Sequence, residues 1–326
     1  MELIDRRAFL NRVIVPLAVR IAAKPFLCLP ESMEQGSRPT AHFPAVARER
    51  IAIASYPFRE FILGKSHPDS PPRTKMALKD FPAHVVSKFA IHRIEPWSEH
   101  FLSLESSYLE DLRNAAGRAG VSFANIAADG DHSLYSDEAE QRERASRFYK
   151  QWIDVAAALG SPSVRTNISP VHNEKPDARG LAERLQPIAE YAASRTIVVH
   201  LENDNPISEN PFVLVEILDR VNSPWLRALP DFGNSLGALP PEEAYRGLDQ
   251  MFARSYGISH VKNLITSEAG TTVPVDMERV FALAAKHNYK GYFSMEWDTE
   301  GDVYQGTSKL IATTLKNISQ KKGEAL

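Results

Sequence analysis

Hydrophobic and polar positions follow one repeating pattern from about residue 50 onward. A short run of β-branched or other apolar residues is followed by polar residues, and then by a longer stretch with apolar positions at helical spacing. Successive runs are separated by roughly 30–40 residues, the length of one strand–helix–strand unit. The apolar runs predict strands at 51–55, 89–95, 121–127, 163–167, 196–202, 226–231, 258–263 and 292–296.

Helical segments are predicted between these strands. The segment 104–120 and the segment 136–160 both end on glycine, and the second begins with a serine cap and an acidic first turn. The same periodicity predicts helices over 181–194, 211–221, 241–255, 275–288 and 305–320.

Eight strands that alternate with helices predict a single (β/α)8 TIM barrel over residues 48–326. An open, doubly wound sheet is the alternative architecture. It is disfavoured because no glycine-rich phosphate fingerprint follows the first strand, where the chain reads ASYPFREF.

Composition narrows the class of protein. The chain has 326 residues, a formal net charge of −3 and a pI near 6.4, so it lacks the basic character of nucleic-acid-binding domains and we expect no nucleic-acid partner. Its single cysteine, Cys28, excludes an intrachain disulfide and a cysteine-based metal cluster.

The first residues resemble a targeting signal. Arg6 and Arg7 precede an apolar stretch, as in a Tat export signal, so we expect a leader over 1–29, a linker over 30–47 and a periplasmic protein. Asp5 and Arg20 depart from that pattern, and the alternative is a cytoplasmic protein whose N-terminal segment packs on the barrel. No membrane span is expected, because the uncharged stretch is far shorter than the roughly 20 residues that a bilayer requires.

Polar chemistry gathers where the later strands end. The run TIVVHLENDN closes on acidic and amide residues, and four successive strands end in or near Glu202, Asp231, His260 and Glu296. Active sites of such barrels lie at the carboxyl ends of the strands, so these side chains should converge. Three carboxylates at one barrel mouth would repel unless a cation sat among them, and the set suits Mn²⁺, Mg²⁺, Co²⁺ or Zn²⁺.

The four motifs VHLEND, LPDFGN, HVKN and YFSMEWD, in this order, resemble the xylose isomerase-like superfamily, which includes sugar epimerases, inosose dehydratases and apurinic endonucleases. The resemblance spans about residues 48–326. It implies that Glu202, Asp231, His260 and Glu296 hold one divalent metal, for which we expect Mn²⁺ first. It also implies that Glu202 and Glu296 form the proton-transfer pair on opposite faces of a sugar substrate.

This chain departs from the ketose 3-epimerases of that superfamily. Asn234 stands where they carry a histidine, Thr266 where they carry an arginine, and Ser208 where they carry an acid. Lys262, two residues after His260, instead resembles the inosose dehydratase-like members. Its ammonium either holds a substrate oxygen or donates a proton in an elimination, and the alternative is an ordinary surface lysine.

Six further residues are candidates for substrate contact. They are Glu95, Arg165, Asn203, Asn234, Lys262 and Trp297. Arg165 can bind substrate or orient Glu202, the two asparagines can orient their metal-binding neighbours, and Trp297 can stack on a sugar or simply pack. His200 shares its strand face with Glu202 and is expected to be a hydrogen-bonded core histidine.

The sequence therefore predicts a metal-dependent isomerase or epimerase that moves a proton next to the carbonyl of a keto-sugar or polyol derivative. One alternative is a lyase or dehydratase acting on a keto-sugar or a 3-keto-glycoside. A second is a sugar-binding protein without turnover. An endonuclease is disfavoured because His260 is the only histidine at these strand ends. Family members often dimerise, so a homodimer is possible.

Overall fold

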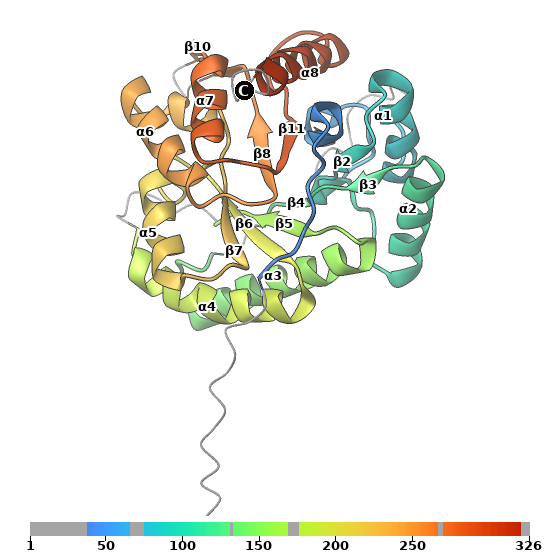
Figure 1. The fold of residues 1–326 in the computed structure, drawn as a ribbon. Coiled ribbons are helices and arrows are strands. Elements are labelled where there is room, and N and C mark those ends of the chain that lie inside the picture. Colours follow the sequence, from blue (N-terminus) through green and yellow to red (C-terminus); the bar gives the residue numbers. More distant parts are fainter. Residues whose placement is uncertain (1–37, 66–74, 131–132, 169–175, 267–269, 321–326) are drawn as a thin grey trace, which may run out of the picture. The chain divides into compact units, whose positions relative to one another are not determined.

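The computed structural model describes residues 38–65, 75–130, 133–168, 176–266 and 270–320, so the predicted leader and residues 30–37 of the predicted linker lie outside the described residues. Two parallel sheets form the centre of the fold, in the orders β3-β2-β1-β11-β8 and β4-β5-β6-β7 (Figure 1). The strands are β1 (Ile51–Ala54), β2 (Arg93–Glu95), β3 (Ser122–Phe123), β4 (Ala127–Ala128), β5 (Ser163–Thr166), β6 (Val198–Glu202), β7 (Leu226–Leu229), β8 (Ile258–Val261) and β11 (Tyr292–Met295).

The two sheets join into one closed barrel. The predicted strand 121–127 is divided into β3, which pairs with β2, and β4, which pairs with β5. At the other seam Asp231 bridges His260, the Phe232 N–H donates to the His260 carbonyl at 3.1 Å, and the His260 N–H donates to the Pro230 carbonyl at 3.2 Å. The predicted (β/α)8 TIM barrel is confirmed.

Helices surround the strands on the outside of the barrel (Figure 1). They are α1 (Phe81–Phe89), α2 (Ser106–Arg118), α3 (Ala139–Leu159), α4 (Ala178–Arg195), α5 (Pro211–Val221), α6 (Pro241–Phe252), α7 (Met277–Lys286) and α8 (Val303–Gln320). Short 3-10 helices are η1 (Ala47–Arg50), η2 (Tyr56–Phe58), η3 (Leu78–Asp80), η4 (Ser98–His100) and η5 (Asn234–Gly237). Within the described ranges no helix is both long enough and apolar enough to cross a bilayer.

One prediction of local structure was wrong. The second strand does not begin at Phe89, because Phe89 closes α1 and Ala90 ends that helix in the left-handed conformation, with φ at 49°. The structure also has an antiparallel pair after β8 that the sequence pattern did not predict: β9 (Leu264–Thr266) and β10 (Thr272–Pro274).

The core follows from the sequence pattern. All four residues of β1 are buried, as expected for a parallel strand covered on both faces. Inside the barrel His200 is buried, and neither ring nitrogen has a hydrogen-bond partner in the described structure, so the expected hydrogen-bonded histidine is not found. Burial lowers the pKa of His200 to about 3, which keeps the imidazole neutral.

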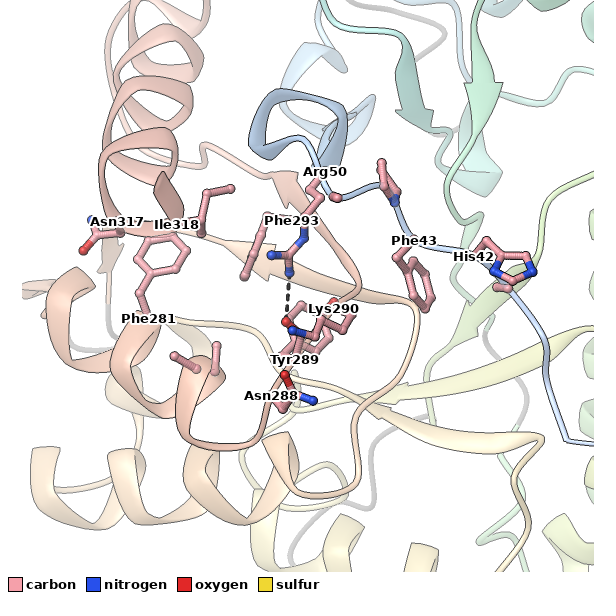
Figure 2. A pocket seen from close by; sticks show the side chains of 15 residues that line it. His42, Phe43, Arg50, Phe281, Asn288, Tyr289, Lys290, Phe293, Asn317 and Ile318 are labelled. Carbon is pink, nitrogen blue, oxygen red and sulfur yellow. Dashed lines mark hydrogen bonds between the residues drawn. The ribbon is translucent and has the colours of Figure 1, made fainter. Parts of the chain in front are cut away.

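A cavity of about 570 Å³ lies at the amino ends of β1 and β11 (Figure 2). Arg50 crosses it and donates to the carbonyl oxygens of Tyr289 and Gly291 at 3.0 Å, with its guanidinium over the Phe293 ring. Active sites of TIM barrels lie at the carboxyl ends of the strands, so this cavity is at the opposite end of the barrel from the expected site. Arg50 there links the start of β1 to the start of β11.

Buried Glu209 ties together the loops that follow β5 and β6. Its carboxyl group accepts hydrogen bonds from the Ile168 N–H and, at 2.8 Å, from the Asn205 N–H. Burial raises the pKa of Glu209 well above its ordinary value, despite these two hydrogen bonds. The carboxyl group is therefore more readily protonated in the folded state than in the unfolded chain.

We predict that Glu209→Gln changes the pH dependence of stability. A carboxyl with a raised folded-state pKa costs stability as pH rises above its unfolded value of about 4.5. Glutamine has one side-chain oxygen in place of two, so it loses one of the two hydrogen bonds from the backbone N–H groups. The variant should therefore be destabilised by about 1 kcal/mol near pH 5. Near pH 8 the difference from wild type should shrink or reverse, because only the wild type must bury a charge. Urea unfolding at both pH values, with the exposed Glu183→Gln as control, measures this; a difference that does not change with pH contradicts the prediction.

Two glycines should respond oppositely to alanine. A Cβ on Gly291 would lie 2.5 Å from the Gly257 carbonyl oxygen and 2.4 Å from the Tyr289 hydroxyl, whereas a Cβ on Gly117, inside α2, meets nothing within 4 Å. Gly117→Ala should therefore stabilise the protein by roughly 0.5–1 kcal/mol through helix propensity. Gly291→Ala should destabilise it by about 2 kcal/mol or more, because backbone must move. Thermal unfolding of both variants tests the pair, and equal melting temperatures would refute the packing argument.

Candidate active site

Four ionisable side chains converge at the carboxyl ends of four successive strands. Glu202 ends β6, Asp231 follows β7, His260 lies in β8 and Glu296 follows β11. Each offers one ligand atom, these atoms all lie within 4.8 Å of one another, and all four residues are buried. The sequence argument placed these residues at one rim, and the structure brings them together.

His260 is held between the cluster and a deeper carboxylate. Its Nδ1 lies 2.7 Å from Glu202 Oε1 and 3.1 Å from Glu296 Oε2, while its Nε2 lies 3.0 Å from both carboxylate oxygens of Glu95. Burial lowers the pKa of His260, but the carboxylates of Glu202, Glu296 and Glu95 outweigh it and raise that pKa well above its usual value. In the neutral ring, an Nε2–H donated to Glu95 directs the Nδ1 lone pair into the cluster.

Asp231 is oriented by backbone amides. Its Oδ1 accepts from the Gly233 N–H at 2.8 Å and from the Asn234 N–H at 2.7 Å, while the buried Oδ2 has no hydrogen-bond partner in the described structure. Burial raises the pKa of Asp231 to about 7. A buried carboxylate oxygen without a donor, beside two more carboxylates and an imidazole nitrogen, fits a divalent cation.

Lys262 is part of this cluster and is buried, which excludes the surface-lysine alternative. Its Nζ donates to Asn234 Oδ1 at 2.8 Å and lies 3.1 Å from Glu296 Oε2 and 3.5 Å from Asp231 Oδ2. Burial alone would lower the pKa of Lys262, but the nearby Asp231 and Glu296 carboxylates raise it well above the usual value. The ammonium is therefore a fixed positive charge at the barrel mouth.

Arg165 orients Glu202. Its Nε lies 2.8 Å from Glu202 Oε2, and its Nη1 forms an ion pair with Asp129. The Trp97 indole N–H also donates to Asp129. Of the two roles considered for Arg165, the geometry favours fixing the carboxylate over binding substrate directly.

Asn203 and Glu95 lie behind the cluster. The Asn203 side chain donates to the Asp231 carbonyl at 3.1 Å and accepts from the Asp231 N–H at 2.7 Å, so it fixes the backbone of a candidate ligand. Glu95 is fully buried on the far side of His260. In these positions both residues orient other groups.

Asn125 belongs to the site but was missed in the sequence. It lies between β3 and β4, donates to Glu95 Oε1 at 2.7 Å and accepts from the Ser163 hydroxyl at 2.6 Å. The only signal was one amide within the apolar run VSFANIA.

Two proteins similar in sequence to this chain are alpha subunits of deglycosidases. The chain is 28% identical over 180 residues to the alpha subunit of a 3'-dehydrocarminate deglycosidase of Microbacterium sp., a match that covers 52% of this chain and 49% of the relative. It is 26% identical over 151 residues to the C-glycoside deglycosidase alpha subunit of Microbacterium trichothecenolyticum, covering 45% and 38%. The chain thus matches half or less of the length of these relatives.

Solved structures share the fold at low identity. A xylose isomerase-like TIM barrel protein of Mycobacterium smegmatis in complex with magnesium superposes with a TM-score of 0.64 at 19% identity, covering 83% of this chain and 96% of that one. The 3-keto-D-glucoside 4-epimerase of E. coli gives 0.60 at 13% identity, covering 82% and 99%. The model of the xylose isomerase-like TIM barrel family matches residues 85–318. The match covers most of the chain, and the protein belongs to the xylose isomerase-like TIM barrel family.

Proposed function

We propose that this protein is a divalent-metal-dependent isomerase or epimerase that moves a proton on the carbon next to the carbonyl of a keto-sugar. The observation that carries the proposal is a pair of carboxylates, Glu202 and Glu296, that both lie within 3.1 Å of His260 Nδ1 in a single buried cluster with Asp231. The sugar epimerases among the structural neighbours support the class of substrate.

Glu202, Asp231, His260 and Glu296 would hold the cation, with Mn²⁺ as the first candidate. When bound, it polarises the carbonyl and the adjacent hydroxyl of the sugar. Glu202, fixed by Arg165, would remove the proton, and Glu296 would return one. Lys262 donates to the substrate oxygen on which negative charge develops, because its ammonium lies beside Glu296 and Asp231.

A second candidate is elimination from a 3-keto-glycoside. The deglycosidase names of the curated relatives and the 3-keto-D-glucoside substrate in the name of the E. coli neighbour favour it. A glutamate would take the proton from C2, the C1 bond to the leaving group would break as the C1–C2 double bond forms, and Lys262 would protonate the leaving group. The first half of this reaction is the proton abstraction proposed above.

We predict that metal binding depends on the four-residue cluster. The purified full chain should take up one Mn²⁺, and at a hundredfold excess over Kd this should add about 2.7 kcal/mol of stability. Glu202→Gln and Asp231→Asn should each weaken Mn²⁺ binding by at least about tenfold, since each removes a charged ligand. Elemental analysis and thermal shift measure this, with the exposed Glu183→Gln on α4 as the matched control. Binding that survives in both cluster variants would place the metal elsewhere.

We predict that Lys262→Met separates the two candidate reactions. NMR in D₂O of keto-hexoses and 3-keto-glucosides reports solvent exchange, epimer formation and release of the leaving group together. Loss of a proton donor should lower the affected step by roughly 10²–10⁴-fold. In an eliminase, release should fall while exchange at C2 persists; in an epimerase, exchange and epimer formation should fall together. Wild-type protein that binds these sugars without any exchange would contradict the enzyme proposal and leave a binding protein.

A further inference from the structure

A second cavity, of about 440 Å³, opens at the same rim as the metal cluster. It is lined by Pro57 and residues 59–61, which follow β1, and by residues 297–304, which follow β11. Glu296, a candidate ligand and base, is followed in the chain by Trp297, the first residue of the second lining segment. The cavity and the cluster are therefore built on the end of the same strand, β11.

Tyr56 lies beside both regions. It directly precedes Pro57, and the guanidinium of Arg59, which lines the cavity, lies 4.4 Å from the centre of its ring. Burial and the charges of Asp298, in the lining, and Glu296, in the cluster, raise the pKa of Tyr56 to about 12.

Aromatic side chains form part of the wall. Phe61 and Tyr304 pack edge to face at 5.7 Å between ring centres. Trp297 packs closely on Gly306, because a Cβ at that position would lie 2.3 Å from the indole. The volume and the aromatic lining are within the range of small-molecule sites, and a ring is the ligand shape that stacks best on aromatic side chains.

The charge of the lining is negative. Glu60, Asp298, Glu300 and Asp302 contribute carboxylates, and Arg59 is the one guanidinium among the residues that line the cavity. Arg59 is already paired with Asp298 at 2.9 Å. This balance disfavours a phosphate or carboxylate in the cavity, while carboxylates readily accept hydrogen bonds from hydroxyl groups.

We infer that this cavity holds the substituent on the anomeric carbon of the keto-sugar, and that this substituent is an uncharged, hydroxyl-bearing ring. The inference rests on the proposed function, because it takes the sugar ring to sit at the metal cluster. It adds a second binding site, formed by the loops after β1 and β11, that selects among glycosides by their leaving group or aglycone.

The test measures binding, so it does not require turnover. Metal-loaded full-length protein is titrated by calorimetry with the methyl, 4-hydroxyphenyl and 4-carboxyphenyl 3-keto-β-D-glucosides. Wild type should bind the hydroxyphenyl compound at least about tenfold more tightly than the methyl compound, and the carboxyphenyl compound more weakly than the hydroxyphenyl one. Glu300→Arg, an exposed charge reversal in the lining, should improve binding of the carboxyphenyl compound by about tenfold and leave the methyl compound unchanged. Glu183→Arg, on α4, is the matched charge reversal that should change none of the three.

Equal affinities for the three compounds, in wild type and in Glu300→Arg alike, would overturn the inference. Solvent exchange at C2, measured on the same samples, separates this result from failure of the proposed function. Exchange with equal affinities refutes the second binding site alone. The expected selectivity without exchange supports the site and refutes the proposed reaction.

Discussion

Burial of charge at one rim of the barrel is the constraint on which the rest of the site depends. Glu95, Glu202, Asp231 and Glu296 bring four carboxylates into it, and Lys262 and Arg165 bring two cations. At about 4 Å each pair of like charges costs roughly 4 kcal/mol at an effective dielectric of 20. Without metal, protonation of His260 and a raised pKa at Asp231 relieve part of that repulsion. With His260 neutral, the carboxylates outnumber the two cations, and Arg165 is shared with Asp129. A divalent cation would reduce this excess of negative charge.

This charge balance explains why several surrounding residues contact the candidate metal ligands. Glu95 contacts His260, Arg165 contacts Glu202 and Lys262 contacts Glu296. The carboxylate of Asp231 is oriented by the Gly233 and Asn234 N–H groups, and Asn203 fixes its backbone. Groups that orient the ligands of a metal limit the geometries that the site can adopt. The fold also contributes to this orientation. Asn125 lies in the break between β3 and β4, and from there its side-chain amide donates a hydrogen bond to Glu95.

The sequence predicted the barrel and the convergence of the four-residue cluster because both follow from one rule, that parallel strands end at a common rim. The helix α1 was missed because Phe89 and Ile91 read equally well as the start of a strand, and the β9–β10 pair because its strands have three residues each. The alternation of side chains along a strand indicated which way Glu95 and His200 point, but not how far inside the barrel they lie. It therefore could not show that Glu95 lies behind His260, or that His200 is buried without a hydrogen-bond partner.

The departures from the ketose epimerase pattern acquire a physical meaning in the structure. Asn234 stands where the ketose 3-epimerases carry a histidine, and it makes contacts of its own within the cluster. Its amide oxygen accepts a hydrogen bond from Lys262, and its amide nitrogen lies 3.5 Å from Glu202 Oε1. Thr266, at the position where the ketose 3-epimerases carry an arginine, is exposed in β9 and pairs with Thr272. The buried cation of this site is Lys262, which lies beside Glu296 and Asp231. Its charge is therefore placed to act inside the four-residue cluster, and not at the exposed edge where Thr266 lies.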